Sequence, residues 1–215
     1  MTLNSMEELT PVHYDVLREI GNIGQGNAAT ALAAFSNKLV TIDVPNVRVL
    51  DITDAIEYLG GPENIVTGIL IRLKGDINGM MLTVLQSSFV KNLVEMVFDR
   101  KPSSPFDLDD TEKSFIQEIG NILSGSYLNA ISSLSGMTTD VSVPSVTTDM
   151  VGAILAVPAV EFAELGSKVL FIDDCFTFSD GFGKAAECSA SRSNMILIPD
   201  IDSLSALFDR LSLPD

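Results

Sequence analysis

The sequence predicts an α+β protein made of a duplicated helix-plus-strands unit with pseudo-twofold symmetry. We expect one continuous, mainly antiparallel sheet that carries two long helices on one face. The main observation is that Glu19-Ile-Gly-Asn22-Ile recurs 99 residues later as Glu118-Ile-Gly-Asn121-Ile. Residues 17–47 align with 116–146 at this offset without a gap, and 11 of the 31 positions are identical. In both halves, apolar residues change from helical spacing to strand-like segments after the repeated peptide.

The first unit opens with a helix that the apolar spacing predicts over residues 11–36. Segments rich in apolar residues then predict three strands, at 40–50, 65–73 and 80–85. Ser87 and Ser88 are expected to cap a helix that ends near Phe98, because serine hydroxyls accept hydrogen bonds from free amides at a helix start. The first half therefore reads as helix, strands, helix.

A proline-containing linker at about residues 101–108 separates repeats of about 11–100 and 109–213, so the chain 1–215 is predicted to be one domain. The second repeat opens with a helix over residues 109–134, whose first turn carries the acidic residues that favour a helix N-terminus. The elements expected next are strands at 138–146, 151–157, 168–178 and 193–198, a surface loop at 179–190 and a last helix at 201–211.

Composition excludes several classes of function. The formal net charge of −16 disfavours nucleic acid and anionic membranes as partners, since both attract Lys and Arg. The sequence contains no apolar run of about 20 residues and begins without a signal peptide, so we expect a cytoplasmic protein without membrane insertion. Cys175 and Cys188 lack metal-site spacing, and a cytoplasmic location predicts no disulfide between them. With a single histidine, His13, no catalytic triad is available.

The polar residues of the repeat fall on one side of each predicted long helix. Four positions in each copy lie within a wedge of about 60° on a helical wheel. They are Asp15, Glu19, Asn22 and Gly26 in the first copy, and Ser114, Glu118, Asn121 and Gly125 in the second. Glycine inside a helix costs about 1 kcal/mol relative to alanine. We interpret its repetition as a sign that a partner surface approaches the backbone, with packing of the helix on a strand as the alternative.

A proline follows each motif at the same distance, because Pro45 and Pro144 each lie 23 positions after the motif asparagine. A helix of 15 residues is about 22 Å long. Seven residues of returning strand cover about 23 Å, which brings Pro45 back beside Asn22. Proline lacks an N–H and suits a strand end or edge, so the prolines are expected to shape the site without reacting, or simply to end a strand.

The motif residues suit the positioning of water better than covalent catalysis. An asparagine amide can hold a water molecule, and a glutamate can pair with a cation of a partner. Phosphoryl hydrolysis fits such a site, because it depends mainly on positioning and charge stabilisation. The alternative for an exposed Glu-x-x-Asn is an ordinary solvated helix face, which the twofold occurrence of the whole pattern disfavours.

The spacing Asp/Ser-x3-Glu-x2-Asn-x22-Pro resembles the signature of the CheC–CheX–FliY family of chemotaxis response-regulator phosphatases. The resemblance extends over most of the chain and is strongest to the CheC-like branch with two intact sites. CheX-like members usually keep one site and act as dimers. FliY-like members carry a further C-terminal flagellar-motor domain, which we do not expect here.

The resemblance implies that the substrate is the phosphorylated response regulator CheY. Glu19 and Glu118 would pair with the lysine of its receiver domain, and Asn22 and Asn121 would orient the attacking water. Asp15 and Ser114 would be peripheral contacts, and Pro45 and Pro144 would shape the rim. The expected Mg²⁺ belongs to the receiver domain, so the chain needs no cofactor or metal of its own.

The family also binds the chemoreceptor deamidase CheD, which would require a second surface. We assign Asp149 to this surface, although an aspartate between two strands is also a common turn residue. The alternative function is that of a non-catalytic flagellar-switch or scaffold protein that binds phosphorylated receiver domains.

Overall fold

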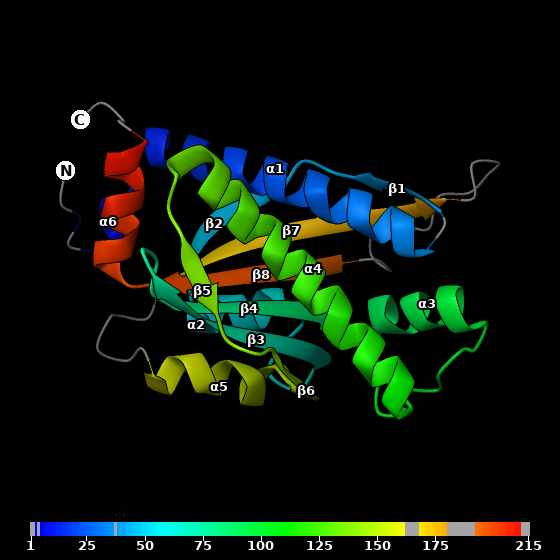
Figure 1. The fold of residues 1–215 in the computed structure, drawn as a ribbon. Coiled ribbons are helices and arrows are strands. Elements are labelled where there is room, and N and C mark those ends of the chain that lie inside the picture. Colours follow the sequence, from blue (N-terminus) through cyan, green and yellow to red (C-terminus); the bar gives the residue numbers. More distant parts are fainter. Residues whose placement is uncertain (1–2, 4, 37, 162–167, 180–191, 212–215) are drawn as a thin grey trace.

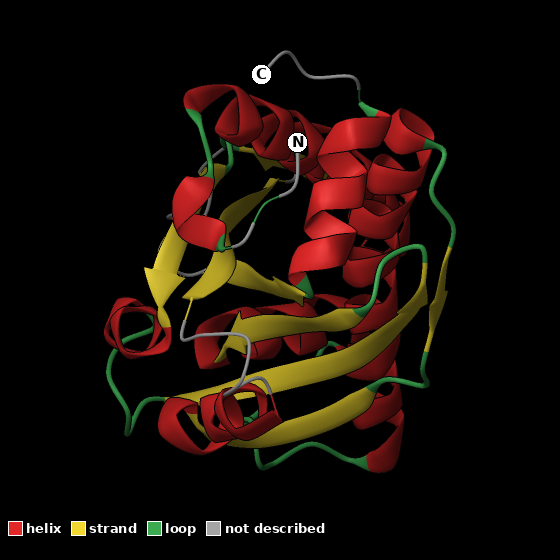
Figure 2. Cartoon of the chain, turned by 90° about the vertical axis from the view of Figure 1, so that its left-hand side faces the viewer, coloured by secondary structure: helices red, strands yellow, loops and turns green. Residues whose placement is uncertain are grey.

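A computed structural model describes residues 3, 5–36, 38–161, 168–179 and 192–211. Two long helices cross one face of a curled sheet, and shorter helices cover its other face and its ends (Figures 1 and 2). The helices are α1 (Pro11–Ser36), α2 (Ile52–Tyr58), α3 (Ser87–Phe98), α4 (Asp110–Ser135), α5 (Val151–Glu161) and α6 (Ile201–Arg210), preceded by a 3₁₀ turn at Met6–Glu8. No described helix is long and apolar enough to cross a membrane.

The described strands form one eight-stranded antiparallel sheet. The strands are β1 (Leu39–Ile42), β2 (Asn46–Asp51), β3 (Ile65–Gly75), β4 (Gly79–Gln86), β5 (Thr139–Val141), β6 (Ser145–Met150), β7 (Lys168–Ser179) and β8 (Arg192–Pro199). Their order is β1-β7-β8-β4-β3-β5, with β2 also paired to β7 and β6 also paired to β3. The predicted fold class, with two long helices on one face of a continuous sheet, is confirmed.

Three apolar clusters hold the layers together. Two lie between the sheet and the long helices, and they contain alternate residues of β3 such as Ile69 and Ile71. The third lies on the opposite face, where α2 and α5 cover Val66 of β3 and Phe171 of β7. Because successive side chains of a strand point to opposite faces, β3 and β7 contribute to both layers of the core.

Helix α4 begins where its sequence predicts. Asp109 accepts a hydrogen bond from the backbone N–H of Glu112, and the Glu112 carboxylate accepts one from the backbone N–H of Asp109. Each residue thus satisfies an amide that the helix leaves free. Gly136 ends the helix in the left-handed conformation at φ 69°.

The predicted cap of α3 is wrong. Gln86 precedes this helix, and the Ser87 hydroxyl donates instead to the backbone oxygen of Ile65 at 2.5 Å. Ser87 therefore ties the start of α3 to the start of β3.

The largest error concerns residues 151–157, which form the start of α5 and no strand. The buried residues of α5 are Val151, Ile154, Leu155 and Pro158, and their spacing of three and four is that of a helix face. Helix α2, which the sequence analysis missed, starts 99 residues earlier and packs beside α5.

Two further expectations are corrected. The strands expected at 40–50 and 138–146 are each interrupted before the proline, which gives β1 and β2 at one edge and β5 and β6 at the other. Cys175 in β7 is disulfide-bonded, which contradicts the expectation of no disulfide. Cys188 and the loop expected at 179–190, apart from Ser179 at the end of β7, lie outside the described residues.

Candidate functional site

Helix α1 presents the first motif to solvent. Asp15, Glu19 and Asn22 are all exposed, as the helical wheel predicts. The Asp15 carboxylate accepts a hydrogen bond from the guanidinium of Arg18 at 2.7 Å, so this acidic group is already paired at the edge of the site. The carboxylate of Glu19 and the amide of Asn22 have no such contact with one another, although the structure describes both residues.

Helix α4 presents the second motif in the same way, with one difference. Ser114, Glu118 and Asn121 are exposed, and the amide nitrogen of Asn121 donates to the Glu118 carboxylate at 3.2 Å. The Ser114 hydroxyl donates to the backbone oxygen of Asp110 at 2.8 Å, which turns it back onto its own helix. The Glu–Asn pair is therefore closed by a hydrogen bond in the second site and open in the first.

The two glycines of the polar wedge border open space. A Cβ atom added at Gly26 or Gly125 would meet no atom within 4 Å. This excludes the alternative that these glycines serve helix–strand packing, since no described strand lies within 4 Å of either added Cβ. The helix backbone at both positions is accessible to another molecule.

Other glycines, which the sequence analysis left without a role, perform the packing. Gly21 lies against Pro45, whose Cγ would be 3.1 Å from an added Cβ. Gly120 in the second motif lies against Ile69 of β3, too close for any Cβ. The glycine of each Glu-Ile-Gly-Asn peptide therefore lets the helix approach the sheet layer, and its spacing from the buried isoleucines was the available signal.

The prolines return to the motifs as the chain geometry predicts. Pro45 is buried against Gly21, the residue before Asn22. The backbone oxygen of Pro144 accepts a hydrogen bond from the side chain of Gln117, the residue before Glu118, at 3.4 Å. Each proline lies at the point where two edge strands meet and beside the motif of its own repeat.

The described part of the chain holds no group of three or more His, Cys, Asp or Glu side chains that could bind a metal ion. The two Glu–Asn pairs offer exposed carboxylates and amides only. Such groups can bind a cation of another molecule and orient water, and neither supplies a nucleophile.

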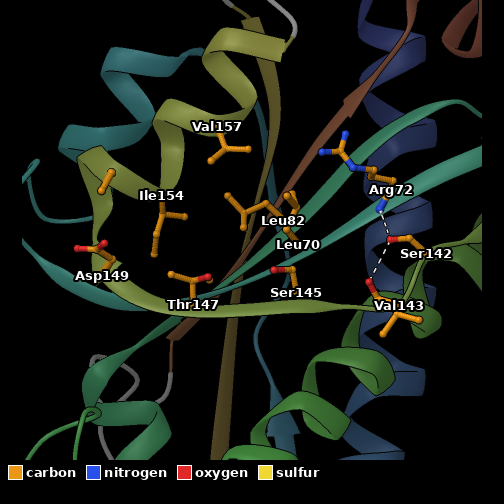
Figure 3. A pocket seen from close by; sticks show the side chains of 12 residues that line it. Leu70, Arg72, Leu82, Ser142, Val143, Ser145, Thr147, Asp149, Ile154 and Val157 are labelled. Carbon is orange, nitrogen blue, oxygen red and sulfur yellow. Dashed lines mark hydrogen bonds between the residues drawn. The ribbon is translucent and has the colours of Figure 1, made fainter.

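Asp149 lies away from both motifs, in β6. It is half-buried, and its carboxylate accepts a hydrogen bond from the backbone N–H of Met150 at 2.7 Å. It stands at one end of a hollow of about 610 Å³ between β3, β6 and α5, with Arg72 at the other end (Figure 3). Arg72 forms a two-pronged ion pair with Glu161. The hollow opens on the face of β3 that points away from α1 and α4.

The first repeat fills the corresponding space with aromatic rings. Tyr58 of α2 packs edge-on against Phe171 at 5.0 Å between ring centroids, and the Arg48 guanidinium lies 4.8 Å from the Tyr58 ring. Arg48 is paired with Phe171 across β2 and β7. The Tyr58 hydroxyl donates to Asp173 at 2.5 Å, which fixes the ring in place.

The second repeat has smaller residues at each of these positions. The 99-residue offset places Val157 at the position of Tyr58 and Thr147 at that of Arg48. Thr147 pairs across β6 and β3 with Gly68, which replaces Phe171. Val157 and Thr147 face one another across the hollow in Figure 3. The second repeat therefore lacks the aromatic cluster of the first, and Ile154 packs on Gly68 at the floor of the hollow.

Comparisons with known proteins identify the family that the chain resembles. The model of the CheC-like family matches residues 12–49 and 112–147, which contain the two motif segments. The protein named CheY-P phosphatase CheC from Bacillus subtilis is 30% identical over 203 residues, which cover 90% of this chain and 91% of that protein. The flagellar motor switch phosphatase FliY of the same organism is 30% identical over 146 residues, covering 66% of this chain and 37% of FliY.

Solved structures share the fold at lower identity. Thermotoga maritima FliY superposes with a TM-score of 0.68 at 20% identity, covering 95% of this chain and 98% of that structure. The FliM middle domain from H. pylori superposes with a TM-score of 0.61 at 11% identity, covering 94% and 99%. These two show the fold alone. With the relative from B. subtilis matched over nearly its whole length, the chain belongs to the CheC-like family.

Proposed function

We propose that the protein is a phosphatase that hydrolyses the aspartyl phosphate of the response regulator CheY. The observation that carries this proposal is the pair of exposed Glu–Asn motifs, each on a long helix beside a glycine with open space around it. The B. subtilis relative, whose printed name is CheY-P phosphatase CheC, supports the same substrate.

In this mechanism the chain contributes position and charge. Glu19 or Glu118 pairs with the receiver-domain lysine, and the neighbouring Asn22 or Asn121 holds water in line with the phosphoryl group. The receiver domain brings the Mg²⁺ that neutralises the developing charge, as part of the substrate. Gly26 and Gly125 leave room for the receiver domain against the helix backbone.

In the second site, the hydrogen bond between Asn121 and Glu118 is expected to change when a partner binds. Asn121 donates to Glu118 in the free protein. When a lysine of the partner engages the Glu118 carboxylate, it competes with this hydrogen bond and frees the Asn121 amide for water. An exposed hydrogen bond contributes only about 1 kcal/mol, so a charged partner can displace it readily.

Phosphate release from Mg²⁺-loaded, phosphorylated CheY tests the proposal. Catalytic amounts of the protein should accelerate release, and the double variant Asn22→Ala/Asn121→Ala should lose the acceleration. Asn27→Ala is the matched control, because Asn27 is an exposed asparagine of the same helix about 140° around from Asn22. Full activity in the double variant would refute the site assignment.

The same assay decides the alternative function. A non-catalytic switch or scaffold protein that binds phosphorylated receiver domains would slow phosphate release, and only at amounts comparable to CheY. The likeness to the FliM middle domain shows that this fold also occurs in a protein with another name, so fold alone does not choose between the two.

We further propose that the hollow beside Asp149 is the surface that binds the deamidase CheD. Support comes from the hollow itself, which lies on the opposite face of the sheet from both motifs and so leaves them free. Val157→Tyr should fill it as Tyr58 fills its counterpart, and should abolish CheD binding measured by calorimetry while phosphate release stays unchanged.

Val160→Tyr is the matched control for this experiment, since Val160 lies on the same helix, is 78% exposed and does not line the hollow. Wild-type CheD affinity in Val157→Tyr would refute the assignment of this surface.

A further inference from the structure

A buried carboxyl group lies beneath the two long helices. Asp174 in β7 is 1% exposed and points to the same face as its strand neighbours Ile172 and Phe176, which belong to the two apolar clusters under α1 and α4. A carboxyl group in such surroundings is unfavourable unless hydrogen bonds compensate for lost water. The position of Asp174 therefore depends on the groups that it meets.

One oxygen of Asp174 meets both helices. It accepts a hydrogen bond from the side-chain amide of Gln25 on α1 at 2.6 Å and another from the Tyr127 hydroxyl on α4 at 2.5 Å. Gln25 and Tyr127 are themselves at most 1% exposed. Gln25 follows Asn22 by three residues, and Tyr127 follows Asn121 by six, so each bond lies close to a motif along the helix.

Two further observations indicate that the side chains are tightly constrained here. The ring of Tyr127 lies against Gly24 of α1, where an added Cβ would be 2.7 Å from Cδ1 of Tyr127. The amide oxygen of Gln25 is buried without a hydrogen-bond partner in the part of the chain that the structure describes. Gln25 thus leaves one polar atom unsatisfied while its nitrogen bonds to Asp174, which is costly and fixes its orientation.

The arrangement occurs once, although the motifs occur twice. The 99-residue offset places Ser124 at the position of Gln25, and Ser124 bonds to Thr83 instead. The residue that corresponds to Tyr127 is Ala28, which carries no hydroxyl. A single cluster in the sheet layer is therefore shared by the two motif-bearing helices.

We propose that Asp174, Gln25 and Tyr127 form a positioning clamp that sets the rotation of α1 and α4 and thereby aligns both Glu–Asn motifs, an inference that rests on the proposed phosphatase function. None of the three residues reaches solvent or substrate. They act through the helices: Gln25 orients the first site, Tyr127 the second, and Asp174 both. A misplacement of about 1 Å in such a site can lower the rate by about a hundredfold.

Variants that keep only one active site separate the effect of Gln25 on the first site from the effect of Tyr127 on the second. Asn121→Ala leaves the first site active, and Asn22→Ala leaves the second. In these backgrounds Gln25→Met should lower phosphate release by the first site about tenfold and leave the second within about twofold, and Tyr127→Phe should do the reverse. Asp174→Leu should lower both. Asp174→Asn retains an oxygen acceptor and should restore most of the rate, which a loss of packing alone would not explain.

The outcomes separate the clamp from the function. If wild type accelerates phosphate release but Gln25→Met and Tyr127→Phe each affect both sites equally, or neither, the clamp is wrong and the phosphatase stands. If wild type gives no acceleration, the function is wrong, and amide hydrogen exchange decides the clamp. Gln25→Met should then speed exchange several-fold in residues 19–29 and leave 118–128 unchanged, with the reverse for Tyr127→Phe. Equal changes in both segments would overturn the clamp.

Discussion

Replacing Asp174 with asparagine should remove a large pH dependence of folding stability. Burial raises the pKa of Asp174 from 3.8 to about 7, against the opposing effect of the hydrogen bonds from Tyr127 and Gln25. The folded protein therefore holds this proton more tightly than the unfolded chain does. The resulting stabilisation is fully present below pH 3.8 and is lost as the pH rises to about 7, where the folded protein also releases the proton.

The size of the effect follows from the pKa difference. Each unit corresponds to about 1.4 kcal/mol, so between pH 4.5 and pH 8 the wild type should lose about 3 kcal/mol of unfolding free energy through Asp174. Asp174→Asn does not titrate and should not show this loss. Burial lowers the pKa of His13, which stabilises the folded state as the pH rises and opposes the effect, so the difference between the two proteins is the quantity to follow.

Urea unfolding at several pH values between 4.5 and 8 gives this difference directly, by linear extrapolation of the unfolding free energy. The unfolding free energy of the wild type should rise relative to that of Asp174→Asn as the pH falls. If the two curves stay parallel over the whole range, Asp174 does not carry a raised pKa and the reasoning fails.

Two other perturbations test the site and the helix that carries it. Gly26→Ala and Gly125→Ala should each stabilise the protein by about 1 kcal/mol in urea unfolding, since the added methyl group meets open space, yet should lower kcat/KM for phosphorylated CheY. An unchanged kcat/KM would mean that no partner surface comes close to the backbone there. Glu112→Ala should lower the unfolding free energy by about 2 kcal/mol, because Glu112 is buried, accepts hydrogen bonds from Arg100 and completes the cap with Asp109. A loss below about 0.5 kcal/mol would contradict this account.

The long helices and central strands could be predicted from sequence because their signals are local. Spacing of apolar residues identified α1 and α4, and the acidic first turn marked the start of α4. Residues 151–157 were misassigned because a short, almost wholly apolar segment suits either a strand or a buried helix. Pro158 lies inside α5 and disfavours a helix, so it gave no help, and only packing against the sheet decides which residues of this segment are buried.

The motif residues could be predicted because the duplication repeats them, while the clamp could not. Gln25 and Asp174 are 149 residues apart, and Tyr127 and Asp174 are 47 apart, so only the folded sheet brings them together. The available hint was the pair Asp173-Asp174 within the mostly apolar β7, because successive side chains of a strand point to opposite faces of the sheet. The hollow could have been predicted more easily, because extending the repeat alignment to Tyr58 and Val157 shows that the second repeat lacks this aromatic ring.

The interrupted margins of the sheet have a consequence for self-association. Each edge consists of two short strands that meet at a proline, and the valine before that proline is largely exposed, 78% for Val44 and 83% for Val143. An unbroken edge of this length would offer a continuous row of free amides and carbonyls to a second molecule, and apolar residues would strengthen the contact. Pro45 and Pro144 interrupt that row of amides and carbonyls next to the exposed valines, where a second molecule would bind most strongly. The same residues that line the two motifs thus protect the chain against edge-to-edge aggregation.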